Sequence, residues 1–186
     1  RDFTVNAMAI ELTTDTPEFI DPHNGVTDLL HKTLRTPISP EISFSDDPLR
    51  MLRAARFAAQ LGFAIEASVL NAMTEMADRL SIISAERIRD EFTKTLMSEN
   101  PRIGITLLVD TGLCEKFLPE IPKLRLEIDE HHHHKDVYEH SLTVLEQSIT
   151  HEDRLGGPNL VARLAALLHD IGKPKTRALI PGGGVS

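Results

Sequence analysis

Residues 44–57 read Phe44-Ser-Asp-Asp-Pro-Leu-Arg-Met-Leu-Arg-Ala-Ala-Arg-Phe57, and this stretch decides how the chain is interpreted. Asp46 and Asp47 are predicted to start a helix. Three arginines follow at intervals of three residues, a spacing that places their guanidinium groups on roughly one side of a helix. These are Arg50, Arg53 and Arg56. Apolar residues occupy much of the remaining surface, so the stretch predicts a core helix with one charged face.

Two carboxylates and three arginines at one helix start indicate either a ligand site or an exposed ladder of charges, because exposed ion pairs are common and weak. A base edge fits the first interpretation. Cytosine and adenine each present an amino donor beside a ring-nitrogen acceptor, whereas uracil and guanine present a carbonyl and a ring N–H there. A carboxylate accepts from the amino group, and an arginine donates to the ring nitrogen. Asp47 and Arg50 are therefore candidates for reading C and A.

Four segments of the chain resemble motifs of one enzyme family. Asp46-Asp-Pro-Leu-Arg50 is similar to the acidic-Asp-x-x-Arg motif of class II tRNA nucleotidyltransferases, the CCA-adding enzymes, although that family usually has Glu at the first position. Three further matches occur in the family's order. They are Arg1-Asp-Phe-Thr-Val-Asn-Ala7, Asp21-Pro-x-x-Gly25-x-x-Asp28-Leu29 with Leu34-Arg35, and Glu86-Arg-Ile-x-x-Glu91.

The resemblance implies roles for several residues of the chain. Arg1, Asp2 and Asn6 would contact the triphosphate and ribose of a nucleotide, with Asp2 nearest the 2′-hydroxyl. Asp47 and Arg50 would act as a protein template for incoming CTP and ATP. The substrate that receives these nucleotides would be the tRNA 3′ end.

Arg53 and Arg56 would brace this template or touch phosphate, and the alternative is purely structural pairing with Asp46 or Glu86. The family's Gly-Gly-x-x-Arg-Asp loop and its Asp-x-Asp pair, which holds the catalytic Mg²⁺, occur nowhere in the 186 residues. We expect both upstream of Arg1. The sequence is therefore interpreted as a fragment that contains no catalytic residue and is inactive alone.

A second group of candidate ligands lies toward the end of the chain. His140 precedes a run with helical spacing, and the apolar segment 164–173 carries the adjacent pair His169-Asp170. Such a pair, with a distant histidine, suits a hydrolytic divalent-metal site. The pattern resembles the HD phosphohydrolase superfamily, which implies His140, His169 and Asp170 as metal ligands. The run His131–His134 is interpreted as a loop, with a metal-binding tract or an expression tag as alternatives.

Composition limits the classes of function. A net charge of −8 weighs mildly against nucleic-acid binding, because phosphate contacts need Lys and Arg. Aromatic residues make up 4% of the chain, too few for a base-stacking surface. No apolar run approaches the roughly 20 residues that cross a membrane. Cys114 stands alone, which predicts a buried thiol and a cytoplasmic protein.

The predicted fold is mainly α. Residues 1–40 would form the C-terminal end of a mixed α/β nucleotidyltransferase head, residues 41–125 a helical neck that binds RNA and carries the nucleotide template, and residues 126–186 the start of an all-α HD domain. A strand is expected over residues 3–12. Helices are expected over residues 47–61, 66–79, 84–97, 101–112, 137–149 and 160–169.

The predicted function is that of a tRNA nucleotidyltransferase that adds CCA to tRNA 3′ ends from CTP and ATP. A bacterial poly(A) polymerase is the alternative within the same superfamily. An alternative of another class is a metal-dependent HD phosphohydrolase with a regulatory helical neck. The HD site is a candidate for a further divalent metal, which the three ligands present are expected to bind only weakly.

Overall fold

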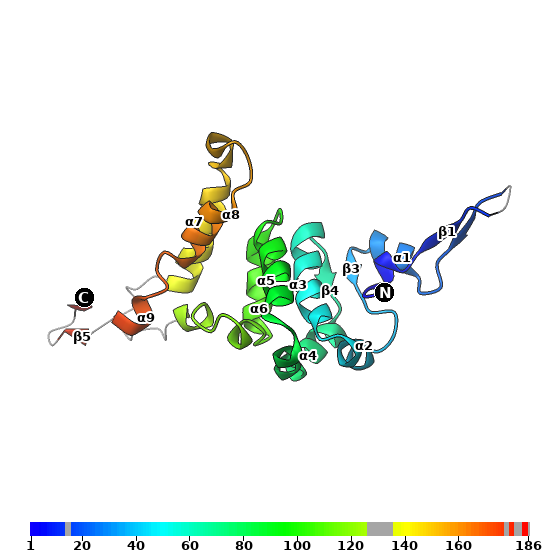
Figure 1. Cartoon of the computed structure of the whole chain (residues 1–186), viewed down its shortest axis with the longest axis horizontal. Coiled ribbons are helices and arrows are strands. Elements are labelled where there is room, and N and C mark those ends of the chain that lie inside the picture. Colours follow the sequence, from blue (N-terminus) through cyan, green and yellow to red (C-terminus); the bar gives the residue numbers. More distant parts are fainter. Residues whose placement is uncertain (14–15, 126–135, 177–178, 181–183, 186) are drawn as a thin grey trace. The chain divides into compact units, whose positions relative to one another are not determined.

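The computed structural model describes residues 1–13, 16–125, 136–176, 179–180 and 184–185 (Figure 1). The chain divides into a first unit, Arg1–Lys116, and a second unit, Phe117–Ser186. The predicted division into head, neck and HD domain stays a prediction, and His131–His134 lies outside the described residues. Among the described residues, no helix has both the length and the apolar character needed to cross a bilayer.

The first unit begins with short elements rather than the single strand expected over residues 3–12. A 3₁₀ turn interrupts that segment, because the Asn6 side chain accepts a hydrogen bond from the Phe3 backbone N–H at 3.2 Å. Strands β1 and β2 pair antiparallel, with Ile10 opposite Phe19. The elements are η1 (Thr4–Asn6), β1 (Ala9–Glu11), β2 (Glu18–Ile20), α1 (Gly25–Leu30) and β3 (Thr33–Leu34).

The remainder of the first unit is helical, apart from a two-residue strand, β4 (Ala64–Ile65), that pairs parallel with β3. The expectation that Asp46 starts a helix is wrong. Asp46 is the last residue of a separate helix, because Ser39 accepts from Ile42 N at this helix's start and Pro40 stands at its first position. The helices are α2 (Pro40–Asp46), α3 (Leu49–Leu61), α4 (Ala67–Glu75), η2 (Ala77–Ile82), α5 (Ala85–Leu96), α6 (Pro101–Asp110) and η3 (Cys114–Lys116).

Helix α3 is the centre of the first unit and packs against both α5 and α6 (Figure 1). Most of its apolar positions are buried, including Met51, Leu52 and Ala55, whereas Leu61 at its end is exposed. The helix ends at Gly62, which adopts the left-handed conformation with φ of 66°, as is common for a glycine after a helix. The charged residues of α3 are therefore held on a helix whose other faces are fixed by packing.

The second unit is also built from helices. α7 and α8 pack against each other. Helix α7 has the bounds predicted from the sequence, and α8 begins at an Asn159 side chain that accepts from Ala162 N at 3.0 Å. The elements are η4 (Pro122–Leu124), α7 (Val137–Ile149), η5 (Glu152–Leu155), α8 (Leu160–Leu168), α9 (Lys173–Thr176), β5 (Leu179–Ile180) and β6 (Gly184–Val185). The prediction of a mainly α fold is confirmed.

Candidate functional site

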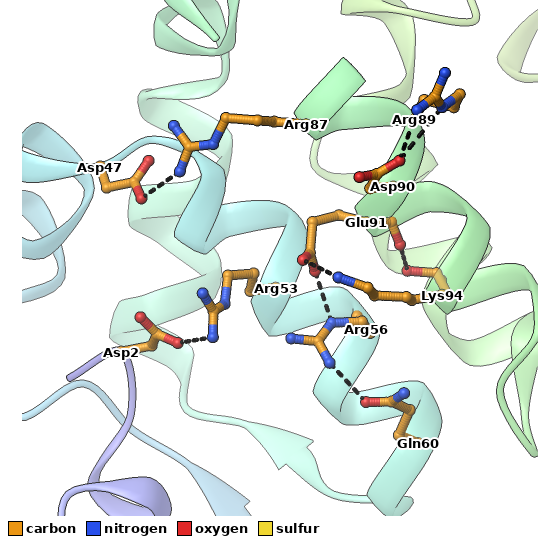
Figure 2. Close-up of polar contacts among 11 residues, drawn as sticks. Asp2, Asp47, Arg53, Arg56, Gln60, Arg87, Arg89, Asp90, Glu91 and Lys94 are labelled. Atoms are coloured by element: carbon orange, nitrogen blue, oxygen red, sulfur yellow. Dashed lines mark hydrogen bonds and ion pairs between the residues drawn. The ribbon is translucent and has the colours of Figure 1, made fainter. Parts of the chain in front are cut away.

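Asp47 lies at the junction between α2 and α3. Its Oδ1 accepts from the backbone N–H of Leu49 at 3.1 Å, which satisfies a free donor at the start of α3. Its Oδ2 accepts from Nη2 of Arg87, on α5, at 2.9 Å (Figure 2). The side chain is 28% exposed. Both carboxylate oxygens are thus oriented by neighbours while the group stays open to a ligand.

Arg50 follows one turn later and is held from two directions. Nη1 donates to the backbone oxygen and to the hydroxyl of Ser43, both at 3.1 Å. Nε lies 3.5 Å from Oδ1 of Asp2. A guanidinium carries five N–H donors, and the contacts that the structure describes use Nε and Nη1, which leaves Nη2 for a base edge.

Asp2 connects the first motif to the helix that carries the candidate template. It forms an ion pair with Arg53 through Oδ2, in addition to its approach to Arg50 (Figure 2). Its side chain is 13% exposed. The structure therefore brings together Asp2, Arg50 and Arg53, a contact that the sequence did not predict, and the partner of Arg53 is Asp2 rather than Asp46 or Glu86.

Arg56 has a different environment from the other two arginines. Nε donates to Oε2 of Glu91, on α5, at 2.6 Å, and the two side chains are 12% and 7% exposed. Its guanidinium lies over the ring of Phe57 at 4.2 Å from the centroid. Arg56 therefore joins α3 to α5, and here too the partner differs from Asp46 and Glu86.

Residues of the segment 21–35 fix the position of the first motif, residues 1–7. Asp28 accepts from the Thr4 hydroxyl at 2.5 Å and pairs with Arg35 at 3.0 Å, so it ties η1 to the loop after β3. Gly25 is required here, because a Cβ atom would lie 2.3 Å from the Thr4 carbonyl oxygen. The backbone N–H of Val26, with that of Gly25, lowers the pKa of Asp21 and keeps its carboxylate charged at the start of α1.

The described contacts of Arg1 and Asn6 do not include the template residues. Arg1 is exposed, and the Asn6 side chain is occupied by the Phe3 N–H. Their assignment to triphosphate and ribose stays a prediction.

Arg87 and Glu91 are the residues that sequence reasoning missed. Both belong to the quoted Glu86-Arg-Ile-x-x-Glu91 motif and contact Asp47 and Arg56 respectively. Residues four apart lie on the same helix face, so the spacing of the motif could have indicated that both side chains point at one neighbour.

The second candidate site lies in the second unit. The potential ligand atoms of His140, His169 and Asp170 lie within 4.8 Å of one another. Nδ1 of His169 lies 2.8 Å from the Ala166 carbonyl oxygen, which can only accept, so Nδ1 carries the hydrogen and Nε2 the lone pair of a neutral ring. That Nε2 lies 3.2 Å from Oδ2 of Asp170.

Two acceptor atoms that face each other can share a proton or a metal ion, and Lys173 Nζ also donates to Oδ2 of Asp170 at 2.6 Å. A backbone carbonyl on the far ring nitrogen is also the usual support for a metal-binding histidine. Burial raises the pKa of Asp170, but the hydrogen bond from Lys173 opposes this effect and the pKa is lowered overall, so the carboxylate stays charged. The donor set therefore fits a divalent metal. A hollow of about 300 Å³ beside it is lined by Asp136, Glu139, His140 and Thr143.

Two protein families match separate parts of the chain. Residues 62–124 match the family described as the probable RNA and SrmB-binding site of polymerase A, and residues 137–181 match the HD domain family. A multifunctional CCA protein of Pseudomonas fluorescens (strain Pf0-1) is 38% identical over 183 residues, which are 95% of this chain and 42% of that protein. An A-adding tRNA nucleotidyltransferase of Deinococcus radiodurans is 38% identical over 189 residues, which are 99% and 42% of the two chains. The resemblance to class II tRNA nucleotidyltransferases with an HD domain is confirmed.

Solved structures of this family have a similar fold. The Bacillus stearothermophilus CCA-adding enzyme in complex with CTP has a TM-score of 0.63 and 29% identity, over 90% of this chain and 41% of that one. A tRNA nucleotidyltransferase complexed with a primer tRNA and an incoming ATP analog has a TM-score of 0.70 and 25% identity, over 90% and 47%. The chain thus spans less than half the length of the relatives it matches.

Proposed function

We propose that the full-length protein is a tRNA nucleotidyltransferase that adds CCA to tRNA 3′ ends from CTP and ATP. The observation that carries this proposal is the geometry of Asp47 and Arg50. Asp47, an acceptor, and Arg50, a donor, lie one helical turn apart, and neighbouring backbone and side-chain groups orient both. Both side chains are also partly exposed, so a ligand can reach them. Relatives that bind CTP, an ATP analog and primer tRNA support the choice of substrates.

In this proposal the chain's own residues orient and select the nucleotide. The carboxylate of Asp47 accepts from the amino group of C or A, and Arg50 donates to the ring nitrogen beside it. Uracil or guanine would leave these groups unmatched, which is the origin of the discrimination. Asp2 lies against Arg50 and Arg53, where it can meet the ribose of the same nucleotide.

Bound Mg²⁺ would supply the activation of the tRNA 3′-hydroxyl for attack on the nucleotide α-phosphorus, and the Asp-x-Asp pair expected to hold it does not occur in the 186 residues. The inactivity of the 186-residue chain alone follows from the same proposal and stays a prediction. We also propose a cytoplasmic location, because the relatives are named as tRNA-processing enzymes and the single cysteine of the chain, Cys114, is buried.

The test replaces Asp47 or Arg50 with alanine in the full-length protein. We expect relative use of CTP and ATP over UTP and GTP to fall about tenfold to a hundredfold, since a bidentate base contact is worth on the order of 1–3 kcal/mol. Incorporation of all four nucleotides on tRNAs that lack A or CCA measures this preference, alongside tRNA affinity. Wild-type nucleotide preference with reduced tRNA affinity in both variants would contradict the template role and identify an RNA-backbone contact.

The same incorporation assay, run with different RNA primers, distinguishes CCA addition, A addition and poly(A) synthesis. An enzyme that extends a tRNA ending in CC but not one that lacks CCA would be an A-adding enzyme, as the Deinococcus relative is named. Long adenosine tails on an RNA without tRNA structure would indicate the poly(A) polymerase alternative.

A second function is favoured by the histidine and aspartate cluster of the second unit. His140, His169 and Asp170 have the donors and the supporting carbonyl contact of a divalent-metal site. We propose that this cluster, completed by ligands outside the chain, hydrolyses a phosphate ester independently of nucleotide addition.

A further inference from the structure

We propose that Arg87 is a positioning residue that holds the carboxylate of Asp47 in the orientation that reads a base. The inference rests on the proposed function, in which Asp47 accepts a hydrogen bond from the nucleotide. Arg87 is 51% exposed and Asp47 is 28% exposed, so the pair lies at the surface where a nucleotide can reach it.

The contacts of Asp47 divide between two elements. Oδ1 is held at 3.1 Å by Leu49 N, within its own helix start, and Oδ2 is held at 2.9 Å by Nη2 of Arg87. A single contact would leave the carboxylate free to rotate about its Cβ–Cγ bond, whereas contacts to both oxygens fix its plane. Each carboxylate oxygen has a further lone pair, so Oδ2 can accept from a base amino group while Arg87 remains in place.

The backbone of Arg87 is fixed relative to the template by the rest of α5. Glu91 lies one turn further along the same face and forms the buried pair with Arg56 of α3. Ile88 and Phe92, also on α5, are buried as well. Arg87 therefore reaches Asp47 from a helix that is anchored to α3, as a support for a precise contact requires.

Arg50 is supported by other groups, namely Ser43 and Asp2. Loss of Arg87 therefore disturbs the carboxylate half of the candidate template and leaves the guanidinium half supported. This asymmetry gives a specific expectation for nucleotide choice: discrimination that depends on the amino group of C and A weakens, while binding of the triphosphate does not change.

The test uses the full-length protein with Arg87→Ala, Arg87→Lys and Asp47→Ala. Arg89→Ala is the matched control, because Arg89 lies on the same helix, is 70% exposed and pairs with the adjacent Asp90 rather than with Asp47 (Figure 2). For each variant, kcat and KM are measured with CTP, ATP, UTP and GTP on tRNA lacking CCA or A, and thermal unfolding is followed separately.

We expect Arg87→Ala to reduce the preference for CTP over UTP by roughly two- to fivefold, which lies within the range that one exposed charge pair supports. The lysine variant should recover part of that loss, and Arg89→Ala should keep the wild-type preference. The melting temperature should be nearly unchanged in all three, which separates positioning from a general stabilising role.

Two results would overturn the inference and leave the proposed function standing. One is an unchanged preference in Arg87→Ala together with a changed preference in Asp47→Ala. The other is an equal rise of KM for all four nucleotides, which would make Arg87 a phosphate contact. An unchanged preference in Asp47→Ala would instead reject the proposed template itself.

Discussion

At the scale of single residues, three similar arginines on one helix have three different roles. Arg50 meets Ser43 and Asp2, Arg53 meets Asp2, and Arg56 is buried against Glu91. Only the first two lie near Asp47 and a nucleotide in the proposed function. The same residue type at the same spacing therefore contacts Asp2 at the start of α3 and joins α3 to α5 further along the helix.

A second buried ion pair gives a prediction of the same kind in the second unit. Glu152 accepts from Nε and Nη2 of Arg163 at 2.7 and 2.8 Å, and the side chains are 7% and 5% exposed. Replacing Glu152 with glutamine removes the negative charge that pairs with the buried guanidinium of Arg163 through two hydrogen bonds. We expect a loss of about 3–5 kcal/mol in the free energy of unfolding, measured by urea denaturation. Asp153→Asn, an exposed neighbour, is the matched control and should change stability by less than about 0.5 kcal/mol.

The pH dependence of this stability has a defined sign. The hydrogen bond from Arg163 lowers the pKa of Glu152 below its ordinary value of 4.5. A group whose pKa is lowered by folding contributes stability that is fully present above 4.5 and is lost as the pH falls through the lower, folded-state pKa. Denaturation at several pH values should therefore show a steeper acid loss in the wild type than in Glu152→Gln. Parallel curves would contradict the assignment.

At the scale of elements, α6 approaches α3 and α5 closely because of one glycine. A Cβ atom on Gly104 would lie 2.3 Å from Cγ2 of Thr95 and 3.0 Å from Cβ of Ala59. Thr95 is 1% exposed and cannot move into solvent. The packing of these three helices therefore requires a residue without a side chain at this position, despite the low helix propensity of glycine.

Replacing Gly104 with alanine should lower the stability of the chain. Overpacking costs about 1–3 kcal/mol, against a propensity gain of about 1 kcal/mol, so a net loss of up to roughly 2 kcal/mol is expected by urea denaturation. Adding Thr95→Ser removes the obstructing methyl and keeps the hydroxyl that donates to the Glu91 carbonyl oxygen. The double variant should recover part of the loss. A stability above that of the wild type in Gly104→Ala alone would show that the helices can separate without cost.

The elements could be predicted from the sequence more completely than their contacts. The bounds of α7 and the end of α3 at Gly62 follow from local patterns of apolar residues and from a glycine stop. The separate helix α2 was missed, although Ser39-Pro40 is a typical helix start.

The partners of the charged side chains could not be derived from local patterns. Arg56 and Glu91 are 35 residues apart, and Asp47 and Arg87 are 40 apart. Which residues meet depends on how α5 packs against α3, and no periodicity in either segment determines that. The local chemistry of Asp47 and Arg50 could be recognised, whereas the support around them required the fold.

At the scale of the whole molecule, the two compact units carry different chemistry. The candidate template lies within Arg1–Lys116 and the candidate metal ligands lie within Phe117–Ser186. The ion pairs that the structure describes for the candidate residues join them to neighbours in the same unit. This division predicts that the two activities can be removed separately.

His169→Ala in the full-length protein should abolish metal-dependent hydrolysis of a phosphate ester and leave CCA addition intact. The physical reason is that His169 would hold the metal through Nε2 while the Ala166 carbonyl orients the ring through Nδ1, so removal of the ring takes away a ligand and its fixed geometry. Phosphate release from p-nitrophenyl phosphate with added Mg²⁺ or Mn²⁺, and metal content after dialysis, measure the first effect. Extension of a tRNA lacking CCA measures the second.

The matched control is His151→Ala, which replaces an exposed histidine just beyond α7 and outside the cluster and should alter neither reaction. Asp47→Ala should show the opposite pattern, with altered nucleotide choice and normal hydrolysis. If His169→Ala and Asp47→Ala each impaired both reactions, the chemistry would be shared between the units and the separate phosphohydrolase function would be wrong.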